Sequence, residues 1–281
     1  MSEENINKDG SMKTGIIGFF DILGYRSFLH NSSPECSEKI VDFMANLKDN
    51  SKDFMMKSLS PDKIDKSKER FLDLVNILVF SDTILLYVEF DDGTDNQIPI
   101  KYNLMHMFVL YLWKSLFEFG LPLRGVIHKG EFMVKNECFA GKAIVEAYDL
   151  AQDLDLAVAA YSTEALNDFI KSVKQSNNTD TWNVLLSHIF PYLAPRKREQ
   201  QEQIFVFNPY AIRSPKFSEE GELNRDIRQY IMNSFLMHNK VISVSAQSKV
   251  NNTEDYFRTG LFHHLHPEGV NNILEALKKD I

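Results

Sequence analysis

Apolar residues run almost unbroken through the stretch GIIGFFDILGYRSFL, residues 15–29, and stop at an acidic residue. The apolar run over residues 16–20 predicts a strand over Lys13–Phe20 with both faces covered, because a half-exposed strand would alternate apolar and polar side chains. Asp21 closes the strand, and Gly24 indicates a turn after it. Either a solvated loop or a ligand could account for this carboxylate.

A second acidic residue stands between two further strand-like runs. Leu74–Phe80 and Thr83–Phe90 are rich in apolar and β-branched residues, and the short polar tip Ser81-Asp82 between them predicts a β-hairpin. The next apolar segment, Pro99–Phe119, predicts a long buried helix. The charged side chains within that segment argue against a membrane span.

The rest of the chain alternates strand and helix patterns. A second hairpin is predicted over residues 121–141, with its turn near Lys129-Gly130. The other predicted elements are a helix starting at Ser33-Pro34, a helix over Lys142–Asp153, a strand over Leu156–Tyr161, a helix capped by Ser162-Thr163 and a strand over Ile204–Phe207. This order predicts an α/β sandwich with one sheet and helices packed on it. Asp21 and Asp82 would then meet at the rim of the sheet.

The two ends of the chain differ in character from the middle. Residues 1–12 are polar and are expected to be disordered. Residues 13–215 are expected to form the mixed α/β domain. Residues 216–281 carry a mostly helical pattern and are expected to form a C-terminal extension.

Charge and cysteine content narrow the class of protein. The net charge of −8 argues against broad binding to nucleic acid or to an anionic membrane. Cys36 and Cys138 offer neither a disulfide framework nor a zinc ligand set. The N-terminus lacks the apolar core of a signal peptide. These features predict a cytoplasmic protein.

The two aspartates suggest a metal site. A lone aspartate at a strand end is usually a turn residue or a helix cap. Asp21 and Asp82 together supply the two carboxylates that a hard cation such as Mg²⁺ accepts beside substrate phosphates. Two such ions can flank a phosphoryl transfer, one on the attacking oxygen and one on the leaving oxygens.

Five segments resemble, in order, the motifs of the class III nucleotidyl cyclases: FFDILGYRSFL, LVFSDTILLY, LPLRGVIHKGEF, ECFAGKAIVEAYDLAQ and LAVAAYSTEAL. The resemblance covers about residues 13–210, and Ser81 replaces the glycine usual at the hairpin tip. The residues of the first two motifs, FFDILGY and VFSDT, are most similar to those of the bacterial antiphage pyrimidine cyclases of Pycsar systems. Those enzymes make cyclic UMP or cyclic CMP, as second messengers, from UTP or CTP.

The resemblance implies a ferredoxin-like sandwich with one mostly antiparallel sheet. It also implies that Asp21 and Asp82, with the backbone carbonyl of Ile22, bind two Mg²⁺ or Mn²⁺ ions. Phosphate-binding groups are implied at the backbone amides of Leu23, Gly24, Tyr25 and Arg26 and at Lys197, close to where the family places a triphosphate-binding lysine. Arg124 is a candidate catalytic cation, and its donor groups would suit the O4 acceptor of uracil better than the amino group of cytosine. In this family a second subunit completes the site, so a homodimer with composite active sites is implied.

Several positions depart from the purine-specific pattern. Leu78 and Cys138 stand where purine cyclases read the base, and Val145 and Asp149 stand where they keep an asparagine and an arginine that stabilise the transition state. A buried Cys138 is the simpler interpretation of that residue. The cations that could compensate are Arg124, His128, Lys129, Lys142 and the trio Arg196, Lys197 and Arg198.

The leading hypothesis is therefore a metal-dependent uridylate cyclase that converts UTP to 3′,5′-cyclic UMP. A cytidylate cyclase and a catalytically silent nucleotide-binding module are the alternatives. Leu78 argues against a purine cyclase, because its side chain cannot hydrogen-bond a base edge. A diguanylate cyclase shares the core topology, but its Gly-Gly-Asp/Glu-Glu-Phe signature is absent from the sequence.

Overall fold

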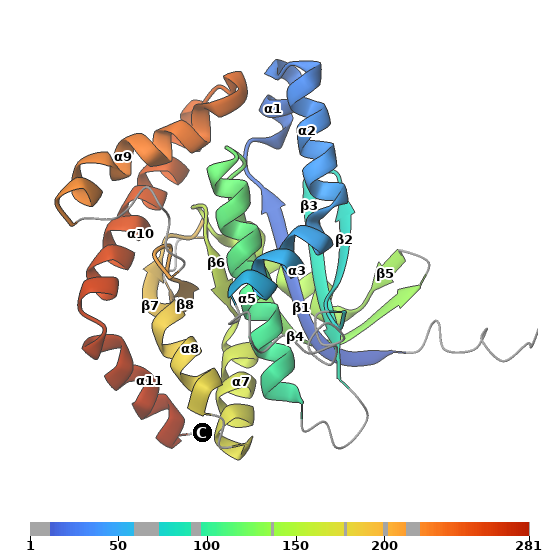
Figure 1. The fold of residues 1–281 in the computed structure, drawn as a ribbon, viewed down its shortest axis with the longest axis vertical. Helices are drawn as coiled ribbons and strands as arrows, with labels where there is room; N and C mark the ends of the chain where they lie inside the picture. Colours follow the sequence, from blue (N-terminus) through green and yellow to red (C-terminus); the bar gives the residue numbers. More distant parts are fainter. Residues whose placement is uncertain are drawn as a thin grey trace, which may run out of the picture.

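A computed structural model describes residues 12–58, 73–90, 97–135, 138–176, 179–198, 202–211 and 220–280. One sheet organises them, with the strand order β2-β3-β1-β4-β6-β8-β7 and with β5 paired to β4 (Figure 1). Its strands are β1 (Lys13–Ile22), β2 (Asn76–Phe80), β3 (Thr83–Glu89), β4 (Leu123–Lys135), β5 (Cys138–Ala140), β6 (Ala159–Tyr161), β7 (Ile189–Ala194) and β8 (Glu202–Phe207). Strands β4 and β6 are parallel, and the other pairs among these strands are antiparallel. The predicted mostly antiparallel sheet is confirmed.

Helices cover both faces of the sheet and continue beyond its β7 edge (Figure 1). They are α1 (Tyr25–Asn31), α2 (Pro34–Ala45), α3 (Leu47–Ser58), α5 (Ile98–Glu118), α6 (Lys142–Asp153), α7 (Thr163–Ser176), α8 (Thr179–His188), α9 (Glu220–Leu236), α10 (Gln247–Leu265) and α11 (Glu268–Asp280), with 3₁₀ turns η3 (Met237–Asn239) and η4 (Val244–Ala246). No helix in the described ranges is long and apolar enough to cross a membrane.

Strand β1 is central, and this position explains its unbroken apolar run. It lies between β3 and β4, with α5 on one face and α6 on the other. A Cβ added at Gly18 would lie 3.5 Å from the Met105 sulfur of α5. On the other face, the ring of Phe19 meets Tyr148 of α6 edge-on, with ring centroids 5.5 Å apart. The predicted doubly covered strand is confirmed.

The first half of the chain follows a βαββαβ order. Strand β1, helices α1–α3, the β2–β3 hairpin, α5 and β4 succeed one another, and their strands lie in the order β2-β3-β1-β4. The predicted hairpin around Ser81-Asp82 is confirmed. Ser33 caps α2 as predicted, because its hydroxyl oxygen accepts the Cys36 N–H at 3.3 Å. Helix α5 stops before Gly120, whose φ is +79°.

The predicted turn at Lys129-Gly130 is wrong. Strand β4 runs through both residues to Lys135, and β5 pairs back from Cys138. Gly130 serves a close approach instead, because a Cβ there would lie 2.8 Å from the Cβ of Ala143 on α6. A glycine in a strand pattern therefore indicated helix packing rather than chain reversal.

The second half differs from its prediction in two strands. Strand β6 is shorter than the predicted Leu156–Tyr161, and β7 was not predicted. Strand β7 contains Pro191, which obscures a strand pattern but is tolerated because β7 is an edge strand. The predicted strand over Ile204–Phe207 lies within β8.

The C-terminal extension is helical, as predicted, and shares the core of the sheet domain. Tyr256 and Phe257 of α10 are buried, and the Phe257 ring lies 5.8 Å from that of Trp113 on α5. The predicted apolar positions Ile227, Ile231, Phe235 and Leu274 are buried. Leu277 and residues 1–11 of the segment expected to be disordered lie outside the described side chains and residues.

Candidate active site

The strand register places four residues in one row across the sheet. Phe80 pairs with Thr83, Thr83 with Asp21, and Asp21 with Arg124. Directly paired residues of antiparallel strands point to the same face. Arg124 bonds to Gln152 of α6, so the row lies on the α6 face. The position of Asp21 beside Arg124 therefore follows from the pairing of β1 with β4.

Asp82 reaches this row through the hairpin tip. The Ile22 N–H donates to the Asp82 carbonyl oxygen at 2.9 Å, which ties the tip to the end of β1. Ser81 has a φ of +55°, a left-handed conformation that explains why a glycine is usual here in the resembling family. The side chains of Asp21 and Asp82 line one cavity of about 280 Å³.

Arg124 neutralises Asp21. Its Nε and Nη2 both donate to Asp21 Oδ2, at 2.9 and 2.7 Å, and the two side chains are 6% and 16% exposed. The remaining N–H groups donate to the carbonyl oxygens of Gln152 and Leu154 and to Gln152 Oε1, so all five guanidinium donors are used. Among the described residues, Asp21 Oδ1 accepts no hydrogen bond.

Fewer backbone amides after Asp21 are available to bind phosphate than the sequence predicted. The Leu23 N–H donates to the Pro122 carbonyl at 2.8 Å, so Leu23 is not available as predicted. Gly24, Tyr25 and Arg26 line the cavity, and the amides at this helix start have no acceptor within α1. Burial, and then the charge of Asp82, raise the pKa of the Tyr25 phenol.

The C-terminal extension also lines this cavity. Phe235, Lys240, Val241, Ile242, Ala246 and Lys249 line it. No signal in the sequence connected these residues with Asp21 or Asp82, because the contact depends on packing between segments more than 100 residues apart. The charged lining thus comprises two carboxylates and four basic side chains, those of Arg26, Arg124, Lys240 and Lys249.

The predicted basic trio divides between different places. Arg196 bonds to Glu202 at 2.8 Å and lies 3.6 Å from Asp153, and Arg198 is largely exposed. Lys197 donates to the carbonyl of Gln152, the residue that also holds Arg124. Burial, and then the charges of Arg124 and Lys249, lower the pKa of Lys197. Lys197 alone of the trio therefore belongs to the electrostatic surroundings of Asp21.

The other candidate cations lie elsewhere. His128 and Lys129 belong to β4 rather than to a solvated turn; His128 is buried with Nδ1 2.9 Å from the Ser162 hydroxyl, and Lys129 pairs with Asp168. Lys142 is exposed and pairs with Glu146 at 3.0 Å. Cys138 is exposed, so the interpretation as a small buried hydrophobe is wrong.

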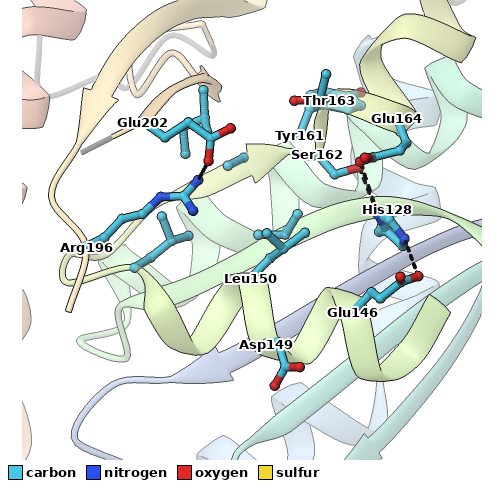
Figure 2. A pocket seen from close by; sticks show the side chains of 14 residues that line it. His128, Glu146, Asp149, Leu150, Tyr161, Ser162, Thr163, Glu164, Arg196 and Glu202 are labelled. Atoms are coloured by element: carbon cyan, nitrogen blue, oxygen red, sulfur yellow. Dashed lines mark hydrogen bonds and ion pairs between the residues drawn. The ribbon is translucent and has the colours of Figure 1, made fainter. Parts of the chain in front are cut away.

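A second cavity, of about 320 Å³, is lined by residues of α6, β4, β6, α7 and β8 (Figure 2). Figure 2 shows the chain Ser162–His128–Glu146 on one side and the Arg196–Glu202 pair on the other. Four carboxylates, one guanidinium and the His128 imidazole line this cavity. Of the residues singled out in the sequence, His128, Asp149 and Arg196 lie here, whereas the predicted metal-binding and phosphate-binding residues do not. Its acidic lining disfavours a polyphosphate, so the Asp21–Asp82 cavity remains the candidate active site.

Comparisons with known proteins give a limited likeness. No protein-family model and no curated protein matches the sequence. Two solved structures of a bacterial light-regulated adenylyl cyclase match the fold, with 13% and 12% sequence identity and TM-scores of 0.39 and 0.40. Each match covers 80% of this chain but 58% of the other. A likeness of this degree carries no argument about activity, which rests on the site.

Proposed function

We propose that this chain is a metal-dependent nucleotidyl cyclase that converts UTP to 3′,5′-cyclic UMP and pyrophosphate. The observation that carries the proposal is one cavity that combines Asp21 and Asp82 with four basic side chains, in a chain of net charge −8. Carboxylates suit divalent cations, and the surrounding cations suit a polyphosphate. The role as a cytoplasmic second-messenger enzyme of antiphage defence rests on the sequence resemblance.

The residues present fit Mg²⁺ or Mn²⁺. Asp21 keeps Oδ1 free of hydrogen bonds, and Asp82 lines the same cavity without an ion pair among the described residues. Within the described ranges no group of three or more His, Cys, Asp or Glu side chains could hold a metal. In the proposal, substrate phosphates and the Ile22 carbonyl would supply the remaining ligands of two ions per site. When bound, the ions would acidify the ribose 3′-hydroxyl and neutralise charge on the pyrophosphate.

The residues of the chain position these groups. Arg124 holds Asp21 in one orientation and keeps a fixed positive charge beside it. Gly24, Tyr25 and Arg26 line the cavity, and backbone amides and a guanidinium are donors from which phosphate oxygens can accept. In-line attack of the 3′-oxygen on the α-phosphorus forms one P–O bond as the bond to pyrophosphate breaks.

The choice of base rests on the resemblance. Leu78, on edge strand β2, offers no polar group to a purine edge. Every donor of Arg124 is used within the protein. The expectation that Arg124 would donate to the O4 oxygen of uracil is therefore wrong. CTP remains the alternative substrate.

A homodimer with composite sites is part of the proposal. The α6 face carries large apolar side chains that solvent reaches: Phe80 is 76% exposed, Val145 58% and Tyr148 46%. Phe80 stands in the row of Asp21, and Tyr148 packs on Phe19 two residues before it. An apolar band beside a charged site is typical of a surface that a second copy covers.

A catalytically silent nucleotide-binding module is the second candidate, and one observation favours it. Two carboxylates without a cation would repel each other. Arg124, however, already neutralises Asp21 within the protein. Repulsion between the two carboxylates is therefore reduced without a metal ion, and the retention of both aspartates does not by itself require catalysis.

Competition among substrates tests the proposal. The purified chain is incubated with equimolar ATP, GTP, CTP and UTP and Mn²⁺, and the products are separated by chromatography. We expect cyclic UMP, and none from an Asp82→Ala chain. A product that is mainly cyclic AMP or cyclic GMP would overturn the pyrimidine assignment. Mainly cyclic CMP would show that CTP is the substrate. The absence of any cyclic product would favour the catalytically silent module.

A further inference from the structure

The C-terminal extension lines part of the candidate active site. Six residues of the extension, from Phe235 to Lys249, line the Asp21–Asp82 cavity. In Figure 1 the extension runs beside the β7 edge, and α9 reaches toward the end of the molecule where α1 lies. The 3₁₀ turn η3 contacts α1 there. The extension and the start of α1 thus enclose one cavity.

Buried polar contacts fix this part of the extension in place. Lys240 is 5% exposed, and its ammonium donates to the carbonyl oxygens of Gly120 and Ser234. His238 donates through Nε2 to the Phe119 carbonyl at 2.6 Å, and its Nδ1 lies 2.9 Å from the Cys36 sulfur. These contacts tie the extension to the end of α5 and to α2. Several buried contacts, rather than one surface contact, therefore hold this part of the extension against the site.

Lys249 is the extension's partly exposed cation at the cavity. It lies on the first turn of α10, its side chain is 21% exposed, and its nearest carboxylate among the described residues, Asp155, is 3.9 Å away. After burial, the charges of Arg124 and Lys249 lower the pKa of Lys197, so these three cations lie close enough to repel one another. Lys240, in contrast, is occupied by backbone carbonyls. Lys249 is therefore the extension residue best placed to receive an anion.

We propose that Lys249 binds the β- and γ-phosphates of the nucleotide, so that the C-terminal extension completes the polyphosphate site within the same chain. This inference rests on the proposed function for the identity of the nucleotide. The ligand chemistry itself, a polyphosphate, follows from Arg26 and Lys249, the two basic side chains of the lining that no backbone carbonyl of the described residues occupies, beside the fixed charge of Arg124. Lys249 supplies a point charge to phosphate oxygens, which arginine can also supply.

Binding of inorganic tripolyphosphate tests Lys249 without any need for turnover. Titration calorimetry in the presence of Mg²⁺ compares the wild-type chain with Lys249→Ala, Lys249→Arg and the control Lys279→Ala, which removes an exposed lysine of α11. We expect Kd to rise at least about tenfold in Lys249→Ala and to stay within about twofold in the other two, because a charge-assisted bond is lost in the first alone. Melting temperatures verify that each variant is folded.

The outcomes separate this inference from the proposed function. If Lys249→Ala binds tripolyphosphate as tightly as wild type, or if the wild-type chain does not bind it, the role of Lys249 is wrong. If binding depends on Lys249 but no NTP is cyclised, the inference holds and the cyclase proposal fails. With an active enzyme, Lys249→Ala should raise KM for UTP by the same factor as Kd, whereas a purely structural role would lower the melting temperature instead.

Discussion

Replacing Asp21 by asparagine should destabilise the protein, although it removes one of two neighbouring carboxylates. Asp21 and Arg124 form a two-bond pair at 2.7 and 2.9 Å, with side chains 16% and 6% exposed. At this burial the charges attract with about 4 kcal/mol for an effective dielectric constant near 20. Breaking a buried pair by removing one partner costs about 3–5 kcal/mol, because the other charge stays buried.

We expect the lower end of that range, about 3 kcal/mol, for Asp21→Asn, because Arg124 keeps its bonds to Gln152 and Leu154. For a chain of this size the melting temperature should fall by roughly 6–12 °C. Asp82 has no ion pair among the described residues, so the matched variant Asp82→Asn should change stability by less than about 0.5 kcal/mol.

A double-mutant cycle decides whether the pair is responsible. Urea unfolding at pH 7.5 without divalent ions is followed for Asp21→Asn, Arg124→Met and the double variant. The coupling free energy between the two sites should be about 2–3 kcal/mol, because the double variant leaves no lone buried charge. Free energies of unfolding that add within about 0.5 kcal/mol would refute the reasoning.

Three further predictions concern pH, assembly and the second carboxylate. Burial lowers the pKa of His188 from 6.5 to about 4, so its stabilising contribution is present above pH 6.5 and is lost as the pH falls toward 4; unfolding free energy should drop by about 2 kcal/mol more between pH 7.5 and 5 in wild type than in His188→Gln. Phe80→Glu and Tyr148→Glu should shift a dimer to monomer in light scattering and reduce activity, and an active, strictly monomeric wild type would contradict the composite site. Asp82→Asn should abolish Mn²⁺-dependent turnover with an unchanged melting temperature, and full turnover would contradict the metal assignment.

Local patterns predicted the elements that carry the two carboxylates. The run ending at Asp21 reads as a doubly covered strand because helices cover both of its faces. The short polar tip before Thr83 reads as a hairpin because both flanking runs are strand-like. Helix α6 has the predicted bounds, Lys142–Asp153, since its amphipathic period and the glycine before it are local features.

Contacts between distant segments could not be predicted from the sequence. The pairing of Asp21 with Arg124 depends on the register of two strands 103 residues apart, and a shift by one residue would separate them. Lys240 and Lys249 reach the cavity through packing of the extension, which leaves no periodic signal. The neutralisation of Asp21 by Arg124 left no local signal for the same reason. Gly130 was misread because close packing and a turn both select glycine.

Product analysis with UTP alone tests the central claim most directly. The purified chain is incubated with UTP and Mn²⁺, and nucleotides and pyrophosphate are quantified by mass spectrometry and a coupled assay, with Asp82→Ala as the matched blank. The account predicts 3′,5′-cyclic UMP and pyrophosphate in equal amounts from wild type and neither from the variant. Linear UMP or UDP in place of cyclic UMP, or equal product from the Asp82→Ala chain, would contradict it.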